Sequence, residues 1–193
     1  MQSDRSLHGR HRLEQLAQQA RDFAMHMMRT TGSVPPTVIA DTADGYIFCM
    51  PTSLTDEAAK DRFADVARLL GIAYNASAIV MIVEAWARMP DKNGHLDTNT
   101  PPSQAPDCKE IVALMLEDRA NSATSLLPII RDAGGKFTEL GDPGPIHFGE
   151  AEGRFSGLMK GISPTAEQSA QAKAALQQLR LSVVNRGFDP TLN

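Results

Sequence analysis

Two continuous apolar runs, Ala78–Val83 and Ile111–Leu116, constrain the fold of this chain more than any other feature. Each has the length of a strand and consists mainly of Ile, Val, Leu and Met, without the three-and-four spacing of a surface helix. A strand that is apolar on both sides is buried on both faces of its sheet. Each run also turns polar at one end, at Glu84 and Glu117, as a strand does where it leaves the covered region. The sequence therefore predicts that these two runs are central strands of a covered sheet.

Three helices are predicted to pack against the sheet. The first has apolar residues at helical spacing from Leu13 to Met27 and ends before Gly32 and two prolines. The second follows a capping hydroxyl and acidic first-turn residues, and the third is rich in Ala and Gln with a Ser-Pro start. The predicted segments are 4–31, Ser53 or Thr55 to about Tyr74, and 164–183, followed by a tail over 184–193.

Short runs rich in β-branched and aromatic residues predict the strands of the sheet. The predicted strands are Thr37–Asp41, Tyr46–Met50, Ala78–Arg88, Glu110–Asp118, Leu126–Asp132 and Lys136–Leu140. Asp44-Gly45 and Gly134-Gly135 mark hairpins, so these neighbours are expected to be antiparallel. A proline-rich polar stretch over 90–107 is predicted to be a long loop. We expect 1–193 to form a single α+β domain, with a mainly antiparallel sheet of about five or six strands packed by three helices.

This order of elements is similar to that of roadblock and longin-type domains, and less closely to that of the profilin and PAS groups. The order runs helix, two strands, helix, three or four strands, helix. The resemblance concerns topology, and it implies an expectation about the fold but none about function.

Composition and terminal sequence indicate the class of protein and its compartment. No apolar stretch reaches the roughly 18 residues of a membrane-spanning helix, and the basic N-terminus is not followed by the apolar core of a signal peptide. Cys49 and Cys108 are too few to staple a chain of 193 residues, which favours reduced thiols in the cytoplasm. The sequence leaves open whether either cysteine is reactive.

A small group of polar residues forms the candidate catalytic site. Its members follow the apolar strands or lie in the later irregular region: Glu84, Glu117, Asp118, Arg119 and His147. A carboxylate held partly out of water at a strand end could serve in acid–base chemistry. If the two central strands pair symmetrically about their loop, Glu84 lies opposite Leu114, which puts it about 10 Å from Glu117 along the strand and on the other face. The alternative is that these strand ends simply face solvent, with Arg88 and Arg119 as ion-pair partners.

No metal, phosphate or cofactor motif is complete. His8-x-x-His11 has helical spacing but lacks further ligands, and the polar residues of 91–99 lack the glycine and glutamate of a calcium loop. Gly134-Gly135-Lys136 lacks the earlier glycine and the following Ser or Thr of a phosphate-binding loop. We therefore expect no cofactor and no metal.

Three functional hypotheses follow from the sequence. The first is a self-associating protein–protein interaction module, an adaptor or inhibitor, that uses an exposed sheet edge or the first helix. Met25 is the methionine of that helix expected to lie off its apolar stripe, and core filling is the favoured role of the methionine cluster. The second is a small enzyme or ligand-binding domain with the acidic site at the strand ends. The third is weak nucleic-acid binding through Arg5–Arg12, although a net charge of −4 opposes it. Within residues 1–31, five arginines outnumber three carboxylates.

Overall fold

The structure is a computed structural model that describes residues 2–51, 54, 56–88, 105, 108–149, 154–161, 163–179 and 182–185, with backbone only for 2–7 and 182–185. In chain order the elements are α1 (Gln2–Thr31), β1 (Thr37–Thr42), β2 (Gly45–Met50), α2 (Glu57–Ala73), β3 (Ala78–Ala87), β4 (Lys109–Asp118), β5 (Ser122–Arg131), β6 (Phe137–Leu140), β7 (His147–Phe148), α3 (Ala166–Gln178) and β8 (Ser182–Asn185). No described helix is both long enough and apolar enough to cross a bilayer.

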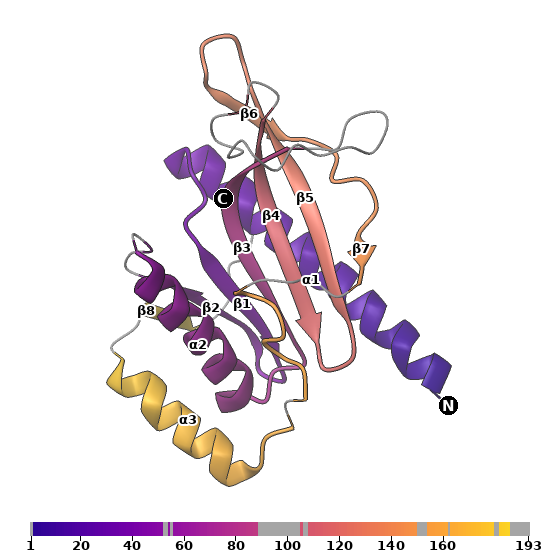
Figure 1. Ribbon diagram of the computed structural model, residues 1–193, viewed down its shortest axis with the longest axis vertical. Coiled ribbons are helices and arrows are strands. Elements are labelled where there is room, and N and C mark those ends of the chain that lie inside the picture. The colour runs from indigo at the N-terminus through magenta and orange to yellow at the C-terminus, as the bar shows by residue number, and fades with distance from the viewer. Residues whose placement is uncertain are drawn as a thin grey trace.

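One antiparallel sheet forms the centre of the molecule (Figure 1). Its strand order is β6-β5-β4-β3-β1-β2-β8, and β7 pairs with the other end of β5. The two predicted hairpins, β1–β2 and β5–β6, are present with antiparallel pairing. The prediction of a single α+β domain with three helices is confirmed, and β7 and β8 add two short strands that the sequence analysis did not include.

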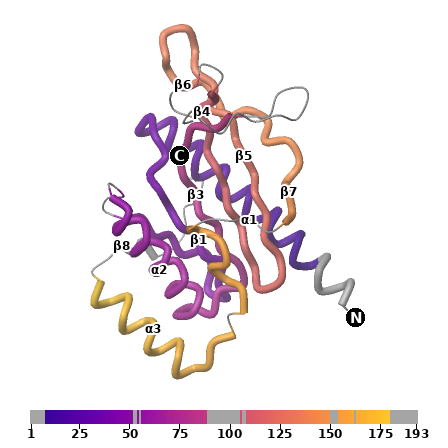
Figure 2. The backbone as a smooth tube through the Cα atoms, in the orientation of Figure 1, coloured from indigo at the N-terminus to yellow at the C-terminus, as the bar shows by residue number. Residues whose placement is uncertain are grey.

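The helices pack against the sheet as predicted, and they cover both of its faces. α1 crosses behind the sheet and contacts β3, β4, β5 and β6, whereas α2 lies on the opposite face against β1 and β3 (Figure 2). Side chains of β3 alternate between the two layers, with Val80 and Ile82 in the core under α1 and Ile79 and Met81 in the core under α2. α3 packs on α2 and so forms an outer layer on that side.

The boundaries of the second and third helices differ from the predicted ones. Asp56 caps α2, and its carboxylate accepts a hydrogen bond from the Ala59 N–H at 2.7 Å; the predicted caps Ser53 and Thr55 lie outside the described residues. α3 begins after Thr165, which forms a reciprocal capping box with Gln168, and not at Pro164.

The C-terminal part of the predicted third helix is a strand instead. α3 ends at Gln178, and Ser182–Asn185 pairs with β2, so neither the helix as far as Val183 nor a tail from residue 184 is correct. The β-branched pair Val183-Val184 suits a strand that gains hydrogen bonds from a neighbour.

The pairing of β3 with β4 is shifted by two residues from the symmetric prediction. Glu84 lies opposite Val112, and Leu114 lies opposite Ile82. Because the shift is even, it preserves the faces, so Glu84 and Glu117 lie on opposite faces as predicted. Their separation grows to five residues along the strand, or roughly 17 Å. The predicted loop over 90–107 lies almost wholly outside the described residues.

Arginines of α1 reach the sheet from several positions along the helix. The Arg10 guanidinium lies 4.9 Å from the centre of the Phe148 ring, and Arg21 donates to the Leu140 carbonyl at 3.3 Å. Arg12 lies 4.0 Å from the Asp41 carboxylate. The positive excess at the start of the chain is therefore directed in part toward β7, β6 and β1. Met25 is half-buried and packs against the core under α1, which agrees with core filling and not with projection away from the helix.

Gly9 marks the closest approach of α1 to the sheet. A Cβ atom placed on it would lie 2.5 Å from Oδ2 of Asp118 and 2.6 Å from Nδ2 of Asn121. The Asp118 carboxylate has little freedom to move, because it accepts hydrogen bonds from the backbone of its own turn. A glycine within a helix otherwise costs about 1 kcal/mol relative to alanine, so this contact explains its presence.

We predict that Gly9→Ala lowers the free energy of unfolding by about 1–3 kcal/mol, because the new methyl group overlaps Asp118 and Asn121. An exposed helical glycine would respond in the opposite direction, since alanine favours the helix. Urea unfolding followed by circular dichroism measures the change, and Gln15→Ala on the exposed side of the same helix is the control. A Gly9→Ala variant as stable as the parent would contradict the close packing.

Candidate functional site

The structure does not bring the five predicted site residues together. Glu117, Asp118 and Arg119 lie at the β4–β5 end of the sheet, whereas Glu84 lies toward the other end, where α1 finishes. His147 is exposed on β7 and pairs through its backbone with Thr124. No single pocket among the described residues contains all five side chains, and each of the carboxylates has a local role.

The Glu117 carboxylate holds a connection against the sheet. It is 4% exposed, and its oxygens accept hydrogen bonds from the backbone N–H groups of Gly157 at 2.6 Å and Met159 at 3.0 Å. Leu158 and Met159 of the same segment fill the core beneath α2. Both oxygens are thus used to position the chain before α3.

Asp118 and Arg119 organise the turn that follows β4. The Asp118 carboxylate accepts hydrogen bonds from the N–H groups of Ala120 at 2.7 Å and Asn121 at 2.6 Å. The Arg119 guanidinium donates to the side-chain carbonyl of Asn75, a residue with a φ of 46° after α2. These hydrogen bonds hold the β4–β5 turn in shape and join it to the C-terminal end of α2.

Glu84 fixes the chain where it leaves α1. Its carboxylate accepts a hydrogen bond from the Val34 N–H at 2.5 Å, and Val34 belongs to the core under α1. Beyond Glu84, on the same face, Trp86 lies opposite Glu110, and Glu110 accepts two hydrogen bonds from Arg131, at 2.6 and 2.7 Å. Trp86, Glu110 and Arg131 thus form a row of side chains across β3, β4 and β5, beyond the C-terminal end of α1.

Glu110 and Arg131 form an ion pair that changes the pKa of the Glu110 carboxyl group. Hydrogen bonding to Arg131 lowers the pKa of Glu110, and burial opposes that effect. The two side chains are 23% and 29% exposed, so the pair is shielded only in part. Trp86, the single tryptophan of the chain, stands beside it and is 50% exposed.

A cavity of about 370 Å³ opens next to this row, between the end of α1 and the β5–β6 hairpin. Its walls are Met28, Arg29, Gly32, Arg131, Gly135, Lys136, Phe137 and Thr138. We call it the α1-end pocket. Within the part of the chain that the structure describes, no carboxylate pairs with Arg29 or Lys136.

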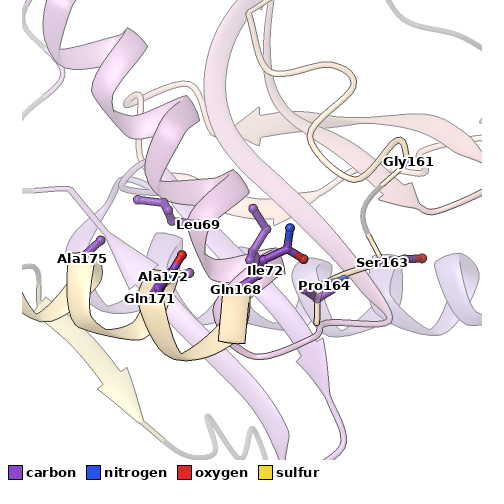
Figure 3. A pocket seen from close by; sticks show the side chains of 9 residues that line it. All are labelled: Leu69, Ile72, Gly161, Ser163, Pro164, Gln168, Gln171, Ala172 and Ala175. Atoms are coloured by element: carbon purple, nitrogen blue, oxygen red, sulfur yellow. The ribbon is translucent and has the colours of Figure 1, made fainter. Parts of the chain in front are cut away.

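A second cavity of about 540 Å³ lies between α2 and α3 (Figure 3). Its lining contains no ionisable side chain; the residues are Leu69, Ile72, Gly161, Ser163, Pro164, Gln168, Gln171, Ala172 and Ala175. The amide oxygen of Gln168 already accepts from the Thr165 N–H, and the amide nitrogen of Gln171 donates to Glu167. This groove therefore offers apolar contact without a group for acid–base chemistry.

The two cysteines are free. Cys49 is fully buried on β2, and burial raises the pKa of its thiol to about 11. A thiol that remains protonated at neutral pH is a poor nucleophile, so Cys49 has the properties of a core residue. Cys108, just before β4, is half-buried.

The other predicted binding motifs have local explanations where they are described. His11 lies near Glu14 and Gln15 on the exposed side of α1, and the described residues contain no group of three or more potential metal ligands. Gly134-Gly135-Lys136 forms the β5–β6 turn, where Asp132 accepts hydrogen bonds from the N–H groups of Gly134 and Lys136. Residues 91–99 lie outside the described part.

Comparison with known proteins finds no matching family, no matching curated protein and no matching solved structure. The resemblance of the element order to roadblock and longin-type domains is therefore not confirmed.

The row of Trp86, Glu110 and Arg131 is the arrangement that sequence reasoning missed. One signal was present, because Glu84 and Trp86 are two residues apart and therefore share a face of β3. Placing Glu110 beside Trp86 and Arg131 beyond it requires the strand register, which the sequence predicted with a shift of two residues.

We predict that Glu117→Gln lowers the free energy of unfolding by about 2 kcal/mol, because the amide cannot accept both backbone hydrogen bonds. Hydrogen exchange at the Gly157 and Met159 amides is expected to accelerate more than exchange in β4. Asp65→Asn, at an exposed carboxylate on α2, serves as the control. Unchanged protection of those two amides would show that other contacts hold the segment.

The lowered pKa of Glu110 predicts a pH-dependent contribution to stability. The carboxylate binds a proton more weakly in the folded state, so its contribution is complete above its ordinary pKa and is lost as pH falls through the folded value. We therefore expect Glu110→Gln to be less stable than the parent at pH 7, with the gap closing below about pH 4. Urea unfolding between pH 3 and 7, with Glu167→Gln as control, measures this. A gap independent of pH would argue against the ion pair.

Proposed function

We propose that this protein is a self-associating interaction module and that two copies meet at the end of the sheet formed by Lys109, Ile130 and Glu139. The observation that carries the proposal is an exposed apolar side chain with opposite charges on its two sides. Ile130 is 40% exposed, and Lys109 and Glu139 are both exposed. A surface of this composition complements a copy of itself.

The strand register supports this arrangement. Ile130 pairs directly with Glu139 on β6, and Ile111 pairs with Pro128, which places Lys109 on the other side of Ile130 on the same face. A twofold axis through Ile130 would bring each lysine opposite the glutamate of the other copy. Twofold contacts in homodimers use the same patch on both subunits, and this row satisfies that condition with two ion pairs around an apolar centre.

Other candidate surfaces have less to offer a second copy. The outer edge of β5 already pairs with β6 and β7, so little of that edge is open to another strand. The exposed side of α1 carries polar residues such as Glu14, Gln15 and Gln18. Of the three large apolar side chains exposed in the described part, Trp86 and Ile130 lie at the same end of the sheet.

Charge reversal tests the proposed contact. We expect Lys109→Glu and Glu139→Lys each to weaken self-association about tenfold, because each replaces two exposed ion pairs by two repulsive ones. The double variant restores both pairs in the opposite sense and should recover the parent affinity. Sedimentation velocity over a concentration series measures the dissociation constant, and Lys60→Glu on α2 is the control.

Two outcomes would overturn the proposal. A parent protein that remains monomeric at every accessible concentration would exclude self-association. A dimer that is equally stable in both single variants would exclude this surface, and Ile130→Asp provides a second check because Ile130 is already exposed in the monomer.

A further inference from the structure

We propose that the α1-end pocket binds a small organic anion, with the charged group held by Arg29, Arg131 and Lys136 and the apolar part against Met28 and Phe137. The pocket lies on the α1 side of the sheet, whereas Ile130 and its neighbours lie on the other side, so this site is separate from the proposed contact between copies. A cavity of about 370 Å³ lies within the size range of small-molecule sites.

Three cationic side chains line this one cavity in a chain of net charge −4. Arg29 and Lys136 come from α1 and the β5–β6 hairpin, elements far apart in sequence that the fold brings together. Neither pairs with a carboxylate among the described residues, so each retains its full capacity for an anion. Converging unpaired cations are the usual means of binding a carboxylate or phosphate.

Arg131 is oriented by Glu110 and still has donor capacity. Its Nε and Nη2 atoms donate to the two Glu110 oxygens, at 2.7 and 2.6 Å, which fixes the guanidinium plane. Its Nη1 atom has only a distant contact, 3.5 Å from the Gly135 carbonyl. A fixed guanidinium with an open donor loses little further entropy when an anion binds.

The acidic groups nearest the pocket are already engaged. Asp132 accepts hydrogen bonds from the N–H groups of Gly134 and Lys136, so its carboxylate is bound into its own turn. Near the end of α1, the carbonyls of His26, Met27 and Met28 accept hydrogen bonds from Thr30, Thr31 and Gly32. The negative end of the helix dipole opposes an anion here, and Arg29, the basic residue of the last turn, offsets it.

The apolar residues that line the pocket favour an organic anion over an inorganic one. Met28 is buried in the core and Phe137 is half-buried against it, and both also line the pocket. An anion without an apolar part would leave this wall exposed to water. The structure therefore favours a carboxylate or phosphate attached to an aromatic or aliphatic group.

Titration calorimetry with phenyl phosphate, benzoate, inorganic phosphate and neutral benzyl alcohol tests the site. We expect saturable one-to-one binding of at least one organic anion, at least tenfold tighter than inorganic phosphate and weakening as salt rises. The relative affinities of phenyl phosphate and benzoate identify the preferred charged group. Trp86 stands beside Glu110 and supplies a fluorescence signal for the same titration. Failure of both organic anions to bind, or equal binding of benzyl alcohol, would overturn the proposal.

Variants locate the binding in this pocket. Arg29→Ala and Lys136→Ala remove exposed side chains and are each expected to weaken binding about tenfold. Arg62→Ala, an exposed arginine on α2, is the control. Affinities for Arg29→Ala and Lys136→Ala equal to that control would place the anion elsewhere. Repeating the titration with Lys109→Glu separates this result from self-association.

Discussion

Burial of β3 and β4 on both faces is the constraint on which the rest of this structure depends. A strand buried in this way cannot leave polar groups near it unsatisfied, since an unpaired polar group in such a place costs several kcal/mol. Three of the four carboxylates on these strands meet that condition in one way, by accepting hydrogen bonds from backbone N–H groups of adjoining connections. Glu84 accepts from the exit of α1, Glu117 from the segment before α3, and Asp118 from the β4–β5 turn. Residues that resemble a catalytic group in the sequence therefore join the two layers to the sheet.

The same constraint explains the charge distribution along the chain. α1 is 30 residues long, and side chains on its flanks reach β1, β6 and β7. Arginine suits those flanks because its long stem covers apolar surface while its guanidinium reaches a carbonyl, a carboxylate or an aromatic ring. Arg10, Arg12 and Arg21 each make such a contact. The basic character of residues 1–31 is consequently used at least in part within the molecule, which weakens the case for phosphate binding by that segment.

Local signals in the sequence were sufficient for most of the fold and insufficient for the site. Gly45 and Gly135 adopt positive φ angles in the two hairpin turns, and glycine does so without steric cost in any surroundings. Asp44-Gly45 and Gly134-Gly135 were therefore enough to predict the two hairpins from the sequence. The capping box of Thr165 and Gln168 was also visible, but Ser-Pro two residues earlier was a competing start signal. β8 was not predictable in this way, because its strand conformation depends on pairing with β2. The row of Trp86, Glu110 and Arg131 depends on the register of three strands. The prediction assumed that β3 and β4 pair symmetrically about the loop that joins them, and the observed pairing is shifted by two residues.

Several charged side chains without an ion-pair partner among the described residues lie at one end of the sheet: Arg29, Lys109, Lys136 and Glu139. The end at Asp118 is closed by Gly9 of α1 and by the contact of Arg119 with Asn75. At the other end, Ile130 and Arg131 are consecutive residues that face opposite sides of the sheet, at a point where the β5–β6 register shifts. One side presents both signs of charge and suits a copy of the chain, and the other presents an excess of cations and suits an anion. Because Glu110 already holds the Arg131 guanidinium in place, an anion can bind on the α1 side without moving the strand segment that carries Ile130 on the other side.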